Sequence, residues 1–146
     1  MEKKAIHPVL APIPAGAYSP AILHNGMIFV SGQTPEKPGS SELVKGDISV
    51  QTEQVMENLK GILSAAGATM NDVLKVTVHL ADIKDFEGYN RVYKRYFSVP
   101  YPSKTTGVAC VICLDVRYLG VSRCAIMHGN QVIQAFLDRR RRHVTA

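Results

Sequence analysis

The chain has 146 residues, of which 46% are hydrophobic, and this is enough for one globular domain. No apolar run approaches the roughly 18 residues of a membrane helix, and the first residues show neither a signal peptide nor a clear transit peptide. We therefore expect a cytoplasmic protein and leave mitochondrial import open. The net charge of +5 comes from the two ends, since residues 5–138 hold 11 basic and 11 acidic residues, which disfavours RNA binding by the body of the domain.

The domain is expected to cover residues 1–138, followed by a basic tail over residues 139–146. The tail contains the run Arg139 to Arg142, and such a block of like charge is typical of a solvated segment. Contact of this tail with RNA or another acidic surface is the alternative. The 3 cysteines, an odd number, cannot form a complete disulfide framework, which favours a reducing compartment.

The strongest local signal is the dipeptide Asn25-Gly26, which readily adopts the two left-handed conformations of a tight hairpin turn. Apolar runs at 21–24 and 27–31 flank it and predict the two strands of the hairpin. Residues 33–46 are rich in proline, glycine and serine, so we expect a surface loop there.

Helix signals follow this loop. Asp47 can cap a helix whose apolar residues recur at helical spacing until Gly67, where a left-handed end is favourable. From 71 to 80 apolar residues alternate with polar ones, which predicts a strand covered on one face. Asp82 offers a second cap, and an aromatic stripe continues in a helix that ends before Pro100, because the residue preceding proline avoids helical geometry.

Residues 104–113 and about 116–127 are rich in β-branched and small side chains, which predicts two more strands. The order is then strand, strand, helix, strand, helix, strand, strand. This order is typical of an α+β layer with one sheet and both helices on one face. The other face needs cover, and we expect self-association to provide it.

Several common kinds of site are excluded because the sequence lacks their motifs. The sequence has no phosphate-binding loop, no dinucleotide-binding glycine pattern and no His-Glu-x-x-His, so we expect no cofactor. The ligand types of a zinc site do occur in Cys110-x-x-Cys113 and Cys124-x-x-x-His128. On one strand, however, the odd separation of Cys110 and Cys113 turns them to opposite faces. We favour small buried hydrophobes at these positions and expect no metal site.

Polar residues gather at the ends of the predicted elements and suggest a small-molecule pocket. The segments concerned are Gly16-Ala17-Tyr18-Ser19-Pro20, Ser31-Gly32-Gln33-Thr34-Pro35, Tyr89-Asn90-Arg91-Val92-Tyr93 and Pro102-Ser103-Lys104-Thr105-Thr106. Between them lie Gly46-Asp47-Ile48, Gln51-Thr52-x-Gln54-Val55-x-x-Asn58-Leu59, Ala65-Ala66-Gly67, Val73-x-Lys75-Val76-Thr77-Val78 and Tyr93-x-x-Tyr96-Phe97. Together these segments resemble the RidA family, also called YjgF, over roughly residues 8 to 110.

The resemblance implies a chorismate-mutase-like fold, with one mixed sheet and two helices on one face, assembled as a homotrimer with sites between subunits. It also implies an imine deaminase, a hydrolase acting on C=N bonds. Such an enzyme converts small 2-imino or enamine acids into 2-keto acids and ammonia without a cofactor. The expected partners are therefore a small 2-imino or 2-keto acid and further copies of the chain. We expect no membrane association, and the neutral charge of residues 5–138 disfavours RNA as a partner.

The resemblance also assigns roles by position. Tyr18 would line the pocket, Gly32 would present its backbone to the substrate, and Asn90 would contribute a side-chain amide. Lys104 occupies the position of the family's arginine, which grips the substrate carboxylate through two parallel hydrogen bonds, and Thr106 stands where many members carry a cysteine. The candidate catalytic residues are Tyr18, Asn90, Lys104 and Thr106, and the candidate substrate-binding residues are Ser31, Gly32 and Lys104.

Two positions depart from the family pattern. Lys104 keeps the positive charge of the arginine but lacks its planar fork, so it holds a carboxylate less firmly. Active members also carry a glutamate on the last strand, whereas this chain has no acidic residue between Val116 and Leu137. We therefore expect slow or altered chemistry. The alternatives are a family member that binds keto acids without turnover and, third, an RNA-binding, endoribonuclease-type translation inhibitor that uses the basic tail.

Overall fold

The structure is a computed structural model that describes residues 2–108 and 132–138. Three features of the sequence lie outside the described residues. They are the strand expected at 116–127, the cysteine and histidine cluster at 110–128, and the basic tail at 139–146.

The hairpin is present as the sequence predicts. Asn25 and Gly26 have positive φ values of 51° and 78° and join β2 (Ala21–His24) to β3 (Met27–Val30) in antiparallel pairing. The strand before this hairpin is not predicted: β1 (Lys4–Ile6) pairs antiparallel with β2 at the edge of the sheet. A strand of 3 residues is too short to show an alternating pattern.

The first helix, α1, spans Ile48–Ala65. Asp47 caps it as predicted, because its Oδ1 accepts the backbone N–H groups of Ser49 at 3.0 Å and Val50 at 3.1 Å. Beyond its last turn, Gly67 has a φ of 70°, the left-handed conformation expected there. Local signals in the sequence therefore fix both ends of α1.

The second predicted helix is divided into two parts. After the short η1 turn (Met70–Asp72) and the strand β4 (Val73–Leu80), the Asp82 side chain accepts a backbone N–H and caps the 3-10 turn η2 (Ile83–Asp85). The helix α2 (Phe86–Tyr96) follows directly. The predicted cap is therefore correct, but it begins a 3-10 turn that leads into the helix.

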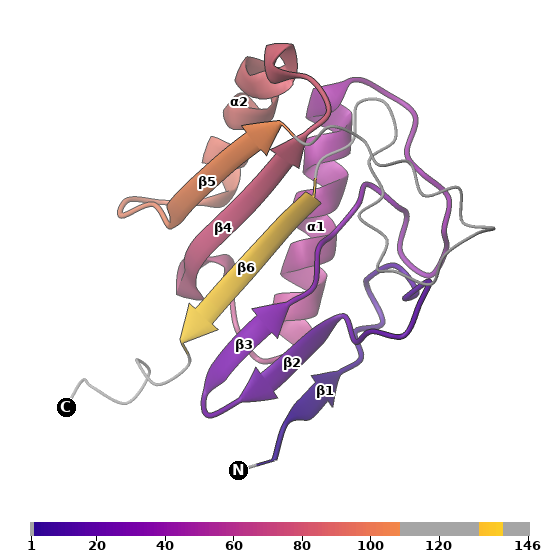
Figure 1. The fold of residues 1–146 in the computed structure, drawn as a ribbon, viewed down its shortest axis with the longest axis vertical. Coiled ribbons are helices and arrows are strands. Elements are labelled where there is room, and N and C mark those ends of the chain that lie inside the picture. The colour runs from indigo at the N-terminus through magenta and orange to yellow at the C-terminus, as the bar shows by residue number, and fades with distance from the viewer. Residues whose placement is uncertain (1, 109–131, 139–146) are drawn as a thin grey trace.

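The strands form one mixed sheet. Its order is β1-β2-β3-β6-β4-β5, where β5 spans Ser103–Val108 and β6 spans Val132–Asp138. β4 and β5 run parallel, and the other neighbouring pairs run antiparallel. Both helices lie behind the sheet in the view of Figure 1. The α+β class, the single mixed sheet and the placement of the helices on one face are thus confirmed.

The central strand β6 corrects the sequence analysis, which predicted no strand at 132–138. β6 lies between β3 and β4, near the middle of the sheet. Its sequence is apolar at most positions, as in a central strand, and so it lacks the alternation by which a half-exposed strand is recognised. The sequence analysis instead predicted the last strand at about 116–127, where β-branched and small residues are frequent.

The helices and the sheet enclose the hydrophobic core between them. Its largest fully buried side chains are Tyr89, Ile28, Met56, Leu59, Ile62, Leu63, Leu80, Val55 and Val76. The N-terminal arm, residues 7–20, packs against α1 at Gly61, where an added Cβ would lie 2.3 Å from the backbone oxygen of Leu10. The arm is held again where the backbone N–H of Gly39 donates to the Ala11 oxygen at 3.1 Å. Glycine at 61 therefore allows the arm to touch the helix backbone.

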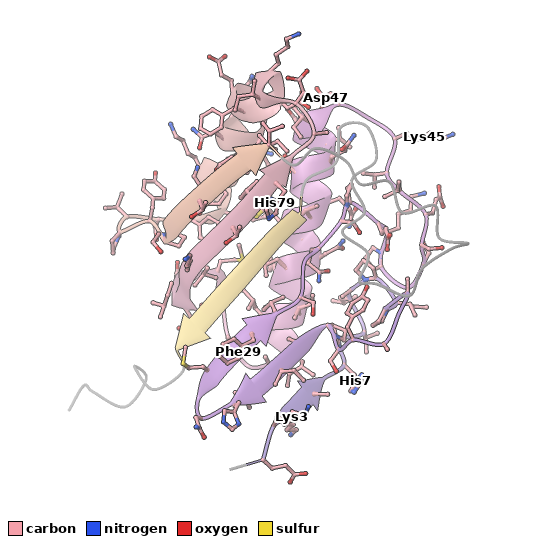
Figure 2. All side chains as sticks on the ribbon, in the orientation of Figure 1. Lys3, His7, Phe29, Lys45, Asp47 and His79 are labelled. Carbon is pink, nitrogen blue, oxygen red and sulfur yellow. The ribbon has the colours of Figure 1, made fainter. Side chains whose placement is uncertain are left out.

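The opposite face of the sheet carries the alternate side chains of the strands. Phe29 is 39% exposed on this face, and Thr77 and His79 are half-buried there (Figure 2). Within residues 2–108 and 132–138, no helix covers it. Neither α1 nor α2 has the length and apolar character needed to cross a bilayer.

Candidate active site

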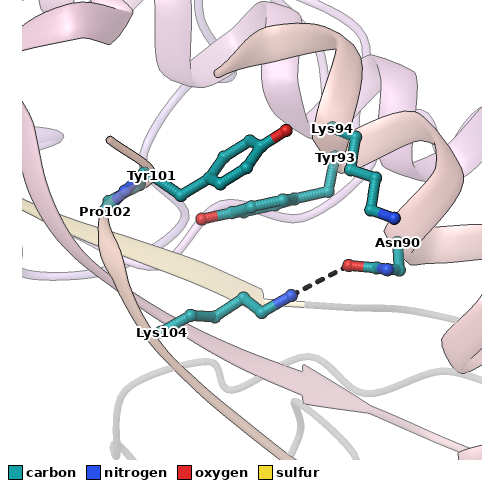
Figure 3. A pocket seen from close by; sticks show the side chains of 6 residues that line it. All are labelled: Asn90, Tyr93, Lys94, Tyr101, Pro102 and Lys104. Carbon is teal, nitrogen blue, oxygen red and sulfur yellow. Dashed lines mark hydrogen bonds between the residues drawn. The ribbon is translucent and has the colours of Figure 1, made fainter. Parts of the chain in front are cut away.

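Lys104 is the second residue of β5, the strand at one edge of the sheet. Its register partner on β4, Val76, is fully buried beneath the helices, so Lys104 lies on the helix-facing side. The Nζ of Lys104 donates a hydrogen bond to the Oδ1 of Asn90 on α2 at 3.0 Å (Figure 3). Two residues that come from separate sequence motifs are thus in direct contact.

Aromatic rings of α2 surround the Lys104 ammonium group. Its Nζ lies 4.5 Å from the ring centroid of Tyr93, 5.1 Å from that of Tyr89 and 5.6 Å from that of Phe86. Tyr89 and Tyr93 lie one helical turn apart, with ring centroids separated by 5.5 Å. Each contact of this cation–π type is worth about 0.5–1 kcal/mol at an exposed site. The rings and Asn90 together fix the position of Nζ.

A pocket of about 210 Å³ opens beside Lys104. Figure 3 shows the Tyr93 ring between the Tyr101 ring and the Lys104 side chain, with the Lys94 amine directed toward Asn90. The volume is below the roughly 300–1,000 Å³ of sites for drug-sized ligands, so the pocket suits a small metabolite. Two amines in so small a space favour an anion. The lining residues are Asn90, Tyr93, Lys94, Tyr101, Pro102 and Lys104.

The electrostatic environment changes the proton affinity of Lys104. Burial lowers the pKa of its amine below the usual lysine value, and the positive charge of Lys94 lowers that pKa further. The aromatic rings favour the charged form and so oppose these two effects. Lys104 therefore gives up its proton more readily than an ordinary surface lysine.

Three buried hydroxyl groups near Lys104 have no hydrogen-bond partner among the described residues; they belong to Tyr89, Tyr93 and Thr106. Burial raises the pKa of Tyr93 to about 12. Burial raises the pKa of Tyr89 as well, and the proximity of Tyr93 raises it further. The nearby Thr106 hydroxyl lowers the Tyr89 pKa, but the Tyr89 and Thr106 hydroxyls are not in hydrogen-bond geometry. Each buried hydroxyl without a partner costs about 1–3 kcal/mol. A ligand that accepts a hydrogen bond from Tyr93 would offset part of this cost.

The other predicted site residues lie around the end of β3. The Oγ of Ser31 donates to the backbone oxygen of Ser19 at 2.7 Å. The buried Gln33 side chain donates to the backbone oxygens of Ser31 at 3.0 Å and Gly32 at 3.2 Å. Tyr18 is 40% exposed on the N-terminal arm. Short local hydrogen bonds thus set the path of this turn and leave the Tyr18 ring at the surface.

The two groups of predicted residues do not meet within one chain. Phe29 on β3 shares a row across the sheet with Phe136, Lys75 and Ser103. Ser103 is therefore three strand spacings from Phe29, roughly 14 Å. Ser31 follows Phe29 at the end of β3, and Lys104 follows Ser103 on β5. The structure brings Asn90 and Lys104 together, places Thr106 beside them, and leaves Tyr18, Ser31 and Gly32 apart.

The strand β6 brings no acidic residue level with Lys104. Ala135 of β6 pairs with Val76, which pairs in turn with Lys104. The acidic residue nearest in sequence on β6 is Asp138, the last residue of the strand and the register partner of Met27. Three residues of strand separate its backbone from Ala135, roughly 10 Å.

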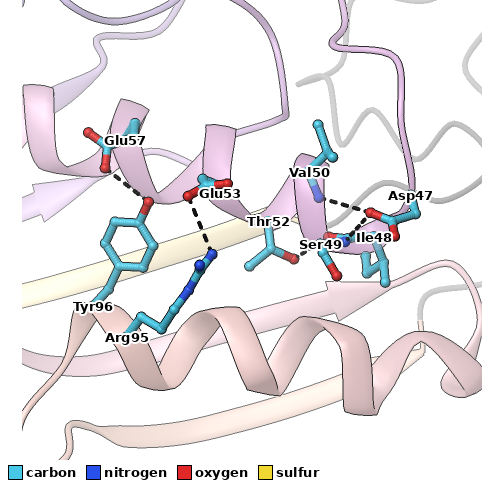
Figure 4. A network of polar contacts seen from close by, with 9 residues as sticks. All are labelled: Asp47, Ile48, Ser49, Val50, Thr52, Glu53, Glu57, Arg95 and Tyr96. Carbon is cyan, nitrogen blue, oxygen red and sulfur yellow. Dashed lines mark hydrogen bonds and ion pairs between the residues drawn. The ribbon is translucent and has the colours of Figure 1, made fainter.

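The helix that carries half of the pocket is tied to α1 by polar contacts (Figure 4). Arg95 forms an ion pair with Glu53 at 3.3 Å, and the Tyr96 hydroxyl donates to Glu57 at 2.9 Å. Burial raises the pKa of Tyr96, and the hydrogen bond to Glu57 raises it further. These contacts lie on the outer side of the helices and support the orientation in which α2 presents its aromatic stripe to β5.

Sequence reasoning found Asn90 and Lys104 but missed part of the pocket. Tyr93 belongs to the predicted aromatic stripe and is buried, and it also lines the pocket. Lys94 and Tyr101 had been given no role, although Tyr101 stands three residues before Lys104. No group of three or more His, Cys, Asp or Glu residues suited to a metal occurs in the described ranges 2–108 and 132–138.

The fold and this pocket define a class of protein: an α+β domain with a small pocket, lined by two amines, where the edge strand of a mixed sheet meets a helix. Residues 9–117 match the family described as Endoribonuclease L-PSP. The chain belongs to this family, the RidA family that its sequence motifs resemble.

Individual relatives agree with this membership. A RutC family protein of Pyrococcus abyssi is 50% identical over 104 residues, covering 71% of this chain and 82% of the relative. The 2-iminobutanoate/2-iminopropanoate deaminase of Rattus norvegicus is 43% identical over 102 residues, covering 70% of this chain and 74% of that enzyme. The crystal structure of E. coli TdcF with bound serine is similar with a TM-score of 0.78 and 29% identity, covering 93% of this chain and 98% of that chain.

Proposed function

We propose that this protein is an imine deaminase that hydrolyses small 2-imino or enamine acids to 2-keto acids and ammonia. The observation that carries the proposal is the Lys104 amine, which Asn90 holds at 3.0 Å in a small pocket beside a second amine, that of Lys94. A 2-imino acid presents a carboxylate next to its C=N bond, and a positively charged amine is a natural partner for that carboxylate.

The names of similar proteins support the same class of substrate. The rat relative is named a deaminase of 2-iminobutanoate and 2-iminopropanoate. The TdcF structure holds serine, a small acid of comparable size. A pocket of about 210 Å³ leaves room for such molecules and not for much larger ones.

In this proposal the site is completed between the subunits of a homotrimer. Ser31 follows a strand that lies three strand spacings from Lys104 in one chain, and Gly32 and Tyr18 lie next to Ser31 on the turn and the adjoining arm. One pocket would therefore combine these residues with the Lys104 and Asn90 of a neighbouring copy. The sheet face that the described helices leave uncovered is consistent with such an assembly. Tyr18 would then close the pocket and Gly32 would approach the ligand with its backbone.

The chemistry requires a water molecule at C2 and a proton for the departing nitrogen. Thr106 and Tyr93 supply hydroxyl groups near Lys104, and β6 supplies no acidic residue level with it. A positioned acid or base is commonly worth roughly 10²–10⁴-fold in rate. We therefore expect turnover below that of family members that carry the last-strand glutamate.

The test measures release of 2-keto acid and ammonia from 2-iminopropionate and 2-iminobutyrate that an amino acid oxidase generates in the assay. The wild type should release ammonia faster than buffer alone. Lys104→Met should reduce this acceleration at least about tenfold, because the variant lacks the charged hydrogen-bond donor. Methionine is chosen because its side chain is unbranched and of similar size. Lys60→Met, on the outer face of α1, is the matched control. No acceleration by a folded wild-type protein would defeat the proposal.

A second candidate function, binding of 2-keto acids without turnover, is favoured because β6 places no acidic residue level with Lys104. It predicts binding of pyruvate or 2-ketobutyrate that Lys104→Ala weakens, with no catalysis in the same preparation. Calorimetry alongside the ammonia assay separates the two functions.

A further inference from the structure

Lysine and arginine differ in one property that matters in this pocket. An arginine keeps its proton in proteins, whereas a lysine amine can lose it and then act as a nucleophile toward carbonyl and imine carbons. Lys104 combines the features that make a lysine nucleophilic. Its Nζ packs against the rings of Tyr89 and Tyr93, which shield it from water, and a second amine, that of Lys94, lines the same pocket.

The hydrogen bond with Asn90 also suits this role. A neutral amine has two N–H bonds and one lone pair. When one N–H of Lys104 donates to the Oδ1 of Asn90 at 3.0 Å, the amine is oriented while its lone pair stays available. Asn90 is uncharged and so does not stabilise the protonated amine as an aspartate would.

Among residues 2–108 and 132–138, the titratable groups that face Lys104 come from two elements. α2 supplies Lys94, Tyr89 and Tyr93, and the segment before β5 supplies Tyr101. None of the four is an acid that would hold the proton on Lys104. Burial and the charge of Lys94 both lower the pKa of Lys104.

We propose that Lys104 is a catalytic nucleophile that forms a covalent imine with the C2 atom of 2-imino and 2-keto acids. This inference rests on the proposed function, since it concerns the same pocket and the same acids. It assigns to Lys104 a role that the arginine at this position in the family cannot fill.

The reaction balances without an added reagent. Nζ forms a bond to C2 of the 2-imino acid, and the two hydrogens of the neutral amine pass to the substrate nitrogen, which leaves C2 as ammonia. Water then adds to C2 of the lysine imine, the C2–Nζ bond breaks, and the amine recovers both hydrogens as the 2-keto acid departs. With a 2-keto acid as the starting compound, the first step releases water instead of ammonia.

The neighbours of Lys104 have defined parts in this scheme. Lys94 keeps a positive charge for the carboxylate while Lys104 is neutral. The Tyr93 hydroxyl is buried, has no partner among the described residues and lines the pocket, so it can donate to the oxygen or nitrogen on C2. A covalent route of this kind also requires less of the acidic residue that β6 does not supply.

The experiment is reductive trapping. The purified full chain is incubated with pyruvate or 2-ketobutyrate and sodium cyanoborohydride, and the product is analysed by intact mass and peptide mapping. We expect one reduced adduct per chain on Lys104, formed at least about tenfold faster than on any other lysine. Lys104→Arg keeps the charge and should lose this adduct, while its background labelling of surface lysines stays as in the wild type.

A second variant tests the role of Lys94. Lys94→Gln removes the charge that lowers the pKa of Lys104, so a higher pH is needed for the same fraction of neutral amine. The rise of trapping rate with pH should shift to higher pH in Lys94→Gln. Lys60→Gln, an exposed lysine elsewhere, should leave the pH profile unchanged.

The outcomes separate this inference from the proposed function. Ammonia release with no adduct on Lys104 overturns the inference and leaves the deaminase in place. An adduct on Lys104 without ammonia release supports the inference and defeats the deaminase. Labelling of Lys104 no faster than that of the other lysines, in a folded protein, also overturns the inference.

Discussion

The two groups of candidate site residues differ in how the chain holds them. Asn90 and Lys104 contact each other across two elements, and the Lys104 amine lies over aromatic rings of α2. Ser31 and Gly32 are held by hydrogen bonds within their own turn and the adjoining arm, and Tyr18 lies at the surface. Asn90 and Lys104 are therefore already in contact in the isolated chain. Ser31 and Gly32 form a fixed turn that has no contact with Asn90 or Lys104 in the same chain.

The largest effect should come from a charge placed inside the first group. Asn90→Asp sets a carboxylate next to the Nζ of Lys104, where it competes with the substrate carboxylate and raises the pKa of the amine. We expect kcat/KM to fall roughly 30–100-fold, because a hydrogen bond to a charged group is worth about 1.5–3 kcal/mol. Asn71→Asp, an exposed site remote from Lys104, is the matched control. An unchanged kcat/KM in Asn90→Asp would remove this contact from the site.

The second effect tests the support of the other group. Gly61→Ala places a Cβ 2.3 Å from the Leu10 oxygen, so the N-terminal arm must move. We expect the free energy of unfolding to drop by about 1–3 kcal/mol, as in overpacked interiors. Helix propensity alone would raise it by up to about 1 kcal/mol. Thermal unfolding distinguishes the signs, with Ser64→Ala on the exposed face of α1 as control.

A smaller effect should follow Ser31→Ala. This change removes the 2.7 Å hydrogen bond to Ser19 and leaves the aromatic rings around Lys104 unchanged. We expect a loss of stability of about 0.5–1.5 kcal/mol, together with a rise in KM larger than any fall in kcat. A fall in kcat at constant KM would show that Ser31 acts in the chemical step, contrary to its place on the turn.

The smallest effect concerns pH. Propionate has a carboxylate but no carbonyl, so it reports the charge of the pocket alone. Its affinity should be highest below the lowered pKa of Lys104 and should decline as pH rises through that value, with Lys94 retaining part of it. Lys104→Arg should keep its affinity across the same range, because the guanidinium stays charged. Equal pH profiles for the two proteins would contradict the placement of Lys104 in the pocket.

The sequence predicts the fold correctly where short-range signals, such as turn and helix-capping residues, determine the structure. Asn25 and Gly26 set the hairpin, Asp47 and Gly67 bound α1, and Asp82 caps the entry to α2. The strand β6 could not be recognised in the same way, since its mostly apolar sequence lacks a clear alternation and resembles a segment of a buried helix.

The sequence predicts only part of the site, because some of its residues depend on contacts between elements that are distant along the chain. Asn90 and Lys104 stood out because family motifs contain them. Tyr93 belongs to a stripe that any buried helix face would show, and its second role depends on how close β5 comes to α2, which spacing along the chain does not encode. Lys94, a polar residue on an amphipathic helix, gives no signal of its own.

The contact between Gly61 and Leu10 bears on what it costs to assemble a site. The arm that carries Tyr18 lies against a helix backbone, so its path is decided inside the domain before anything binds. A ligand or neighbouring chain that meets this arm finds it preorganised and loses less conformational entropy than it would by ordering a free segment. Gly61 would thereby lower the conformational entropy cost of any binding that involves this arm.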